Sequence, residues 1–410
     1  MVFAEIVGTL SFLQPQFDDD IVDRLHYYYT TTFLLLTALI ISLKMFGGRP
    51  IECWLPAEYK SSWEDYTEIY CWARNTYYAS FEGVLPEVGR RDRTMISYYQ
   101  WVPFFLAMAA VSFYLPCLFW RLLYKKSGIK LNQIMAFAND KENVRRVPRK
   151  ANINGLAAHL ASIFKNRFRF SEKSILKRIA YISRIRFHAA YMTCLYCSIK
   201  VLYLFNVLFQ MFLLSRFLET NSIGFFGYGI MWDLVKGNGW KESPNFPIIT
   251  YCDMQIRTQS DVQRHTVQCV LIINLFSEKI FVLLWLWYTF MGFVSFYGVM
   301  TMILRNIMPN QRLHFVTSRL QLADAQFSKE LYEVELKEFV FDYLKSDGVF
   351  VLRMINTHAG VLMASEIIDK MFEVFLMERE ETIQGCPNYR LRRKISILEP
   401  LICRDESFEV

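Results

Sequence analysis

Four long apolar stretches constrain the fold of this chain more than any other feature of its sequence. They cover residues 27–46, 102–124, 189–215 and 270–304. A helix needs about 20 consecutive apolar residues to cross the hydrocarbon core of a bilayer, whereas apolar runs of about 10 to 14 are typical of buried helices. All four stretches reach the spanning length. The sequence therefore predicts a membrane protein with four transmembrane helices.

The first stretch is expected to remain in the mature chain. A cleaved secretory signal would combine a basic start with a short apolar core and small residues at a cleavage site. The 26 residues before this stretch are instead acidic overall, and the stretch itself is long. We interpret it as a retained span.

The basic residues predict which side of the membrane each loop occupies, because Lys and Arg gather on the cytoplasmic side. Residues 125–188 contain 16 Lys and Arg against 3 acidic residues, whereas 47–101 contain 6 and 217–268 only 4. The middle loop is therefore expected inside, the other two loops outside and both termini inside. One local feature disagrees, since Arg24 is the only base before the first span, beside four aspartates. We give the large basic loop more weight.

The cysteines divide between the two sides of this topology. Of nine cysteines, four fall in the outer loops, namely Cys53, Cys71, Cys252 and Cys269. An even set in an oxidising compartment predicts two disulfides, and four cysteines allow three pairings that the residues alone leave open. A zinc site is a weaker alternative, because His265 is the only other ligand nearby.

Polar residues in the first span form a possible functional stripe. Thr30, Thr37 and Lys44 recur every seven residues and so share nearly one helix face. In one interpretation Lys44 extends to the outer interface and the stripe has no function; in the other the stripe lines water. Both interpretations stay open at this point.

The first 17 residues carry apolar side chains at helical spacing, which predicts a short amphipathic helix. It is too short to span a bilayer. Helices that lie on a membrane surface usually carry basic residues, and this one has Glu5 and no base. We therefore expect it to pack against the first span in an aqueous vestibule.

The remaining segments complete the predicted architecture. The second outer loop contains FPIITYCDMQIR (246–257), whose Ile, Thr and Tyr content predicts a strand ending near Cys252. The chain after Arg305 is mixed in charge and helical in pattern, with a turn expected at 347–350, and predicts a folded inner domain of about 100 residues. The fold class is thus membrane all-α: a four-helix bundle, a small disulfide-tied extracellular domain with some β structure, and a helical cytoplasmic domain.

No enzyme motif appears in the sequence. There is no P-loop, dinucleotide fingerprint, HExxH or paired nucleophile and base, so we predict neither catalysis, cofactor nor metal. No nucleic-acid-binding motif accompanies the basic loop, so no nucleic-acid partner is expected. Its charge is explained by its place on the cytoplasmic side, with binding of anionic lipid headgroups as the alternative, and membrane lipids are expected partners of the chain.

The sequence resembles the innexins, the invertebrate gap-junction family. The resemblance extends to about residue 381 and is strongest in the two-cysteine outer loops, in CDMQIR (252–257), in NLFSEKIFVLLWLW (274–287) and in the signature YYQWVPF, which comprises Tyr98, Tyr99, Gln100, Trp101, Val102, Pro103 and Phe104. Connexins are similar in architecture but use three cysteines in each outer loop.

The resemblance implies a ring of eight subunits, with six as the alternative, that forms a hemichannel and docks with a second ring on the adjacent cell. It implies that Phe3, Glu5 and the Thr30, Thr37 and Lys44 stripe line the pore. It also implies disulfides between the outer loops, for which we favour Cys53 with Cys269 and Cys71 with Cys252.

We divide the chain accordingly into an N-terminal pore helix and linker (1–26), spans (27–46, 102–124, 189–216 and 270–304), extracellular loops (47–101 and 217–269), a basic cytoplasmic loop (125–188) and a cytoplasmic helical domain with tail (305–410). Two other functions remain as alternatives: an undocked hemichannel that releases small molecules, and a four-span adhesion or scaffold protein without a pore. Neither outer loop contains an Asn-x-Ser/Thr glycosylation site, and glycans would obstruct docking, so the junction is favoured.

Overall fold

The computed structural model describes residues 15–16, 18–79, 87–91, 95–172, 190–217, 246–257, 259, 261–324 and 327–384. The chain divides into two compact units. The first contains Ile21–Trp120 and Ser198–Val299, and the second contains Gln16–Asp20, Arg121–Cys197 and the chain from Met300 onward.

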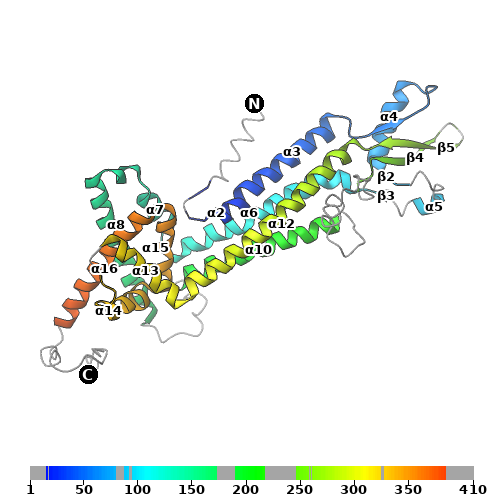
Figure 1. The fold of residues 1–410 in the computed structure, drawn as a ribbon. Coiled ribbons are helices and arrows are strands. Elements are labelled where there is room, and N and C mark those ends of the chain that lie inside the picture. The colour runs from blue at the N-terminus through cyan, green and yellow to red at the C-terminus, as the bar shows by residue number, and fades with distance from the viewer. Residues whose placement is uncertain are drawn as a thin grey trace, which may run out of the picture. The chain divides into compact units, whose positions relative to one another are not determined.

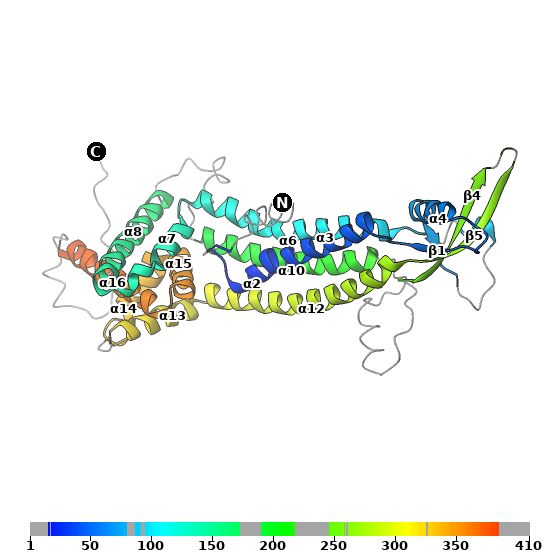
Figure 2. The ribbon, with the colours of Figure 1, turned by 90° about the horizontal axis from the view of Figure 1, so that it is seen from above.

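Four helical segments are long and apolar enough to cross a membrane: Ile21–Gly47, Tyr98–Ser127, Tyr191–Phe217 and Ile272–Ile307. Their main helices, α3, α6, α10 and α12, run side by side (Figures 1 and 2). The predicted four-helix membrane fold is confirmed. In order, the elements are α2 (Ile21–Arg24), the π-helix η2 (Leu25–Thr30), α3 (Thr31–Gly47), the 3-10 helix η4 (Tyr98–Trp101), α6 (Val102–Tyr124), the 3-10 helix η5 (Lys125–Ser127), α10 (Tyr191–Phe217) and α12 (Ile272–Ile307).

The outward faces of these helices are apolar, as contact with lipid requires. Large apolar side chains remain more than half exposed on each span, among them Ile40, Met108, Phe205 and Phe293. In a water-soluble protein, so much exposed apolar surface would be unusual. Between the helices, a second set of apolar side chains is fully buried, including Leu34, Phe113, Val207 and Tyr288.

A five-stranded sheet in the first unit joins the two outer loops. Its strands are β1 (Glu52–Trp54), β2 (Thr76–Tyr77), β3 (Met95–Ile96), β4 (Ile249–Arg257) and β5 (Val262–Val270), in the order β1-β5-β4-β2-β3. Every pairing is antiparallel. Along β4 the buried residues alternate, at Thr250, Cys252 and Met254, because successive side chains of a strand point to opposite faces. The predicted strand is therefore present as β4, but it does not end near Cys252 and continues to Arg257.

Two helices lie between strands of this sheet in the sequence: α4 (Ser61–Arg74) between β1 and β2, and the short α5 (Val88–Arg91) between β2 and β3. Figure 2 shows α4 beside the strands and the β4–β5 hairpin extending beyond them.

The second unit is helical, as predicted for the cytoplasmic domain. Its elements are α7 (Leu131–Ala138), η6 (Lys141–Val144), α8 (Arg146–Glu172), α13 (Pro309–Ala323), α14 (Glu333–Glu338), the π-helix η8 (Phe339–Leu344), α15 (Lys345–His358) and α16 (Val361–Gln384). Fully buried Phe164, Leu320, Phe339 and Met371 form part of its core. An Arg149–Glu366 ion pair, with an N–O distance of 2.6 Å, joins α8 to α16.

The prediction of a turn at residues 347–350 is wrong. These residues lie in α15, and Asp347 is fully buried. Its carboxylate accepts hydrogen bonds from the backbone amides of Met192 and Thr193 (3.1 and 2.9 Å) and from the Thr193 hydroxyl (3.0 Å). The first amides of a helix have no partner within it, so Asp347 caps the start of α10 from a distant part of the chain. An Asp-Gly pair is typical of turns, and the sequence does not show the distant backbone amides that Asp347 binds.

Candidate functional site

Two disulfides hold the outer loops together. Cys53 in β1 lies directly opposite Cys269 in β5 and is bonded to it. Cys71 in α4 is bonded to Cys252 in β4, with their Cα atoms 5.8 Å apart. The pairing that the family resemblance favoured is therefore confirmed. Each bond links the first outer loop to the second.

Three of these cysteine sulfurs lie close together, and the disulfides explain this without a metal ion. The sulfurs of Cys53, Cys71 and Cys269 lie within 4.8 Å of one another. All three belong to disulfides, and a metal ligand must be a thiolate. The residues present therefore do not fit a zinc site.

Helix α4 is held against the sheet by more than its disulfide. The Thr67 hydroxyl contacts the Met254 sulfur at 3.4 Å, and both side chains are buried. The Tyr70 hydroxyl accepts a hydrogen bond from the backbone amide of Gln255 at 3.4 Å. Together with the disulfide, these contacts hold one face of α4 against residues 252–255 of β4.

Asp253 on β4 is the centre of a polar network in the extracellular domain. Arg91 donates to both of its carboxylate oxygens at 3.0 Å, and Thr266 on β5 donates at 2.7 Å. The Tyr77 hydroxyl donates at 3.3 Å. Burial and the Asp253 charge raise the pKa of Tyr77 to about 12, and the hydrogen bond to Asp253 raises the pKa of Arg91. One carboxylate thus links α5, β2, β4 and β5.

The signature YYQWVPF connects this domain to the second span. Gln100 donates through Nε2 to the backbone oxygen of Trp72 (2.5 Å) and to the side-chain oxygen of Asn75 (3.1 Å). The last carbonyls of a helix lack partners within it, so Gln100 caps the end of α4. Tyr99 is fully buried, with its ring 4.8 Å from that of Trp72. The ring of Tyr98 lies 5.5 Å from that of Phe246 in the second outer loop.

The rest of the signature starts α6. Val102 is buried, whereas Trp101 and Phe104 are exposed. Aromatic side chains favour the membrane interface, and Pro103 lies in the first turn of the helix, where its missing N–H has no intrahelical acceptor to lose. The signature therefore both caps the end of α4 in the extracellular domain and begins the second transmembrane helix.

The polar stripe of the first span is largely internal to the subunit. Thr30 is fully buried, and its hydroxyl accepts from Trp287 Nε1 at 2.8 Å and donates to the Leu25 carbonyl at 2.7 Å. Thr37 is 7% exposed and donates to carbonyls of its own helix. Lys44 is partly exposed. This burial argues against a water-facing role for the two threonines. Phe3 and Glu5 lie outside the described residues.

A buried polar cluster beside Thr30 was missed by the sequence interpretation. Lys200 Nζ lies 2.8 Å from Asp23 Oδ1, and both side chains are 3% exposed. His26 shares a 2.7 Å hydrogen bond with Ser295 and stacks on Tyr203 with ring centroids 4.7 Å apart. The sequence contained a signal for this cluster, since Asp23 lies next to the first apolar stretch and Lys200 lies within the third. Charged residues seldom enter a membrane bundle without partners.

The backbone of the first span changes at this cluster. Residues Leu25–Thr30 form a π-helix, in which the Thr30 hydroxyl donates to the carbonyl five residues earlier. Single-turn π segments occur frequently at functional sites. The buried polar cluster and the π-helix thus lie at the same end of the first span.

The fold and the site define a class: a four-span membrane protein whose two outer loops form one disulfide-bonded extracellular domain. The innexin family model matches residues 19–375. The chain is 37% identical to Innexin-10 of Caenorhabditis elegans over 380 residues, covering 92% of this chain and 68% of the relative. It is 37% identical to Innexin unc-9 of the same organism over 379 residues, covering 92% and 97%. With Innexin-11 of that organism, 35% of 399 residues are identical, covering 94% and 86%.

The chain belongs to the innexin family. Innexins are a channel family rather than a family of enzymes, and their members are multi-pass plasma-membrane proteins of gap junctions.

Proposed function

We propose that this chain is a gap-junction subunit that assembles into a ring of eight, with six as the alternative, and that the ring docks with a ring on the adjacent cell. The docked pair passes ions and small molecules between two cytoplasms. One observation carries the proposal: both outer loops are covalently joined in a single sheet that continues directly into the second and fourth spans.

The outer half of the β4–β5 hairpin suits a docking role. Residues 253–257 and 262–266 pair with each other, while β1 pairs only near Cys269 and β2 only at Tyr251. Beyond these pairings the hairpin is narrow and mainly polar, with exposed Gln263 and Arg264 at its outer part. A rigid domain loses little conformational entropy on association, which favours docking through this hairpin.

The pore wall is proposed to include Lys44 together with Phe3 and Glu5. Lys44 is the member of the predicted stripe that remains partly exposed in the subunit. Thr30 and Thr37 support this wall from behind, since their hydroxyls hold the first span to α12 and to its own carbonyls.

Electrical recording from paired cells tests the function. Cells that express only this protein should show junctional current when paired. Current in single cells without coupling would instead support the undocked hemichannel, and neither current would support an adhesion or scaffold protein. An exchange of Gln263 and Arg264 for Ala should reduce coupling without reducing the amount of protein at the surface.

A further inference from the structure

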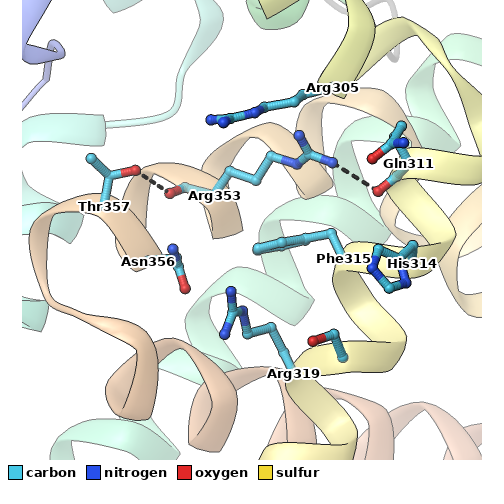
Figure 3. Close-up of a pocket in the computed structure, with 9 residues that line it drawn as sticks. Arg305, Gln311, His314, Phe315, Arg319, Arg353, Asn356 and Thr357 are labelled. Atoms are coloured by element: carbon cyan, nitrogen blue, oxygen red, sulfur yellow. Dashed lines mark hydrogen bonds between the residues drawn. The ribbon is translucent and has the colours of Figure 1, made fainter. Parts of the chain in front are cut away.

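A basic cavity lies in the second unit, where the end of α12 is followed by α13 and approached by α15. It has a volume of about 340 Å³. Three arginines line it, Arg305 from the last turn of α12, Arg319 from α13 and Arg353 from α15. Figure 3 shows their side chains around Phe315, with His314 at the side. Residues from three helices thus converge on one space.

Phe315 positions two of these arginines. The guanidinium carbon of Arg353 lies 4.9 Å from the centre of the Phe315 ring, and that of Arg319 lies 5.6 Å from it. Arg353 also donates from Nη2 to the Gln311 carbonyl at 2.9 Å. Such contacts restrict the side chains before any ligand arrives, which lowers the entropy cost of binding.

The positive charge of the cavity is not neutralised by the residues around it. No acidic residue lines the cavity within the part of the chain that the structure describes. Ion pairs of this unit join other residues, such as Arg149 with Glu366 and Arg379 with Glu335. The buried Nε atoms of Arg319 and Arg353 have no hydrogen-bond partner among the described residues.

The electrostatics of Arg353 agree with this geometry. Burial, followed by the charges of Arg305 and Arg312, lowers the pKa of Arg353 to about 10. A cation destabilised by burial and by neighbouring cations is stabilised by an anion that enters the same space.

We propose that this cavity binds a phosphorylated anion through the guanidinium groups of Arg305, Arg319 and Arg353. A guanidinium presents its donors in a planar fork that matches two phosphate oxygens. The volume is at the lower end of the range of about 300 to 1,000 Å³ found for small-molecule sites. It therefore suits a compact phosphate ester, supplied either by a soluble polyphosphate or by a phosphorylated lipid headgroup. Because Arg305 belongs to α12, the ligand binds directly to the end of a membrane-spanning helix.

The test uses the full-length protein in nanodiscs of neutral lipid. Calorimetric titration with inorganic pyrophosphate and with a nucleoside triphosphate measures the soluble source. A parallel preparation contains a phosphoinositide in the nanodisc. Stabilisation of the protein against thermal unfolding in this preparation measures binding of the lipid source. The variant is Arg305→Gln with Arg319→Gln, because neither side chain donates a hydrogen bond to the backbone of its unit in the described contacts. Arg145→Gln with Arg146→Gln, which changes two exposed arginines of the same unit, is the charge-matched control.

Binding in either arm should weaken by about tenfold or more in the double variant, since hydrogen bonds to charged groups are the stronger ones, and should be unchanged in the control. The arm that responds identifies the source. Arg353→Lys, which keeps the charge and loses the fork, should also weaken binding. Absence of binding in both arms, or equal affinity of the double variant and the unaltered protein, would overturn the proposal. Binding is measured without paired cells, so this outcome is independent of the proposed channel function.

Discussion

Lys200 on the third span lies 2.8 Å from Asp23 at the start of the first, with both side chains almost fully buried. The pair joins helices that are far apart in the sequence. It also accounts for one of the four aspartates that disagreed with the charge distribution of the loops. Asp23 is paired inside the bundle, so it does not count as a free negative charge on that side of the membrane.

Lys200→Met should strongly destabilise the bundle, because it removes the lysine from a buried carboxylate. Breaking a buried ion pair on one side typically costs about 3 to 5 kcal/mol. Thermal unfolding of the purified protein measures the loss. Combining this change with Asp23→Asn should restore much of the stability, since both charges are then absent. Equal stability of the single and double variants would contradict the pairing.

Replacing Cys53 or Cys269 by Ser should disrupt the extracellular domain and abolish coupling between cells. Loss of a disulfide from a small extracellular unit typically costs about 2 to 5 kcal/mol. Junctional conductance and thermal unfolding of the purified protein are the measurements. Cys194→Ser, at an exposed cysteine outside the disulfides, is the control and should couple normally. Normal coupling in the Cys53 variant would show that the bond is dispensable.

Gln100→Ala should loosen the end of α4 from the second span. It removes hydrogen bonds to Trp72 and Asn75 and leaves a helix-end carbonyl without its donor, at a cost of about 1 to 3 kcal/mol. Hydrogen exchange of the amides of α4 should accelerate. Gln263→Ala, on the exposed part of β5, should leave exchange in α4 unchanged. Similar exchange in both variants would rule out the capping role.

Alkaline pH should weaken the extracellular domain as Tyr77 ionises. Its pKa is about 12 in the folded protein, raised by burial and by Asp253, against about 10 for an ordinary tyrosine. The folded state holds the proton more tightly, so this contribution to stability is complete below a pH of about 10 and is lost as the pH rises towards about 12. Unfolding followed by tyrosinate absorbance measures it. Tyr77→Phe should remove this part of the pH dependence, whereas Tyr66→Phe, at an exposed site, should not.

Cysteines placed at Lys44 and Thr37 should respond differently to a water-soluble thiol reagent. Lys44 is partly exposed and is the proposed pore residue, so labelling there should reduce conductance. Thr37 is buried within the subunit, so a cysteine there should label slowly and leave the current unchanged. Rapid block at position 37 with no effect at position 44 would reverse the assignment of the stripe.

The extracellular domain shows which features could be predicted from the sequence and which could not. The residues predicted four paired cysteines and a strand near Cys252, and the family resemblance favoured the bonding partners that the structure confirms. The network around Asp253 was not predictable, because its partners Arg91, Tyr77 and Thr266 come from three separate segments. Strand register brings Tyr77 and Thr266 to this carboxylate, and the position of α5 brings Arg91.

The sequence by itself determined the number of spans, because the thickness of a bilayer sets a length that an apolar run either reaches or does not. It also determined the disulfide-bearing loops, because charge and cysteine content follow the compartment on each side. Only the tertiary structure decided which face of each helix is buried. Thr30 turns inward to Trp287, Asp347 caps α10, and three distant arginines meet at one cavity. These outcomes depend on how the helices pack against one another, and periodicity along a single helix does not contain that information.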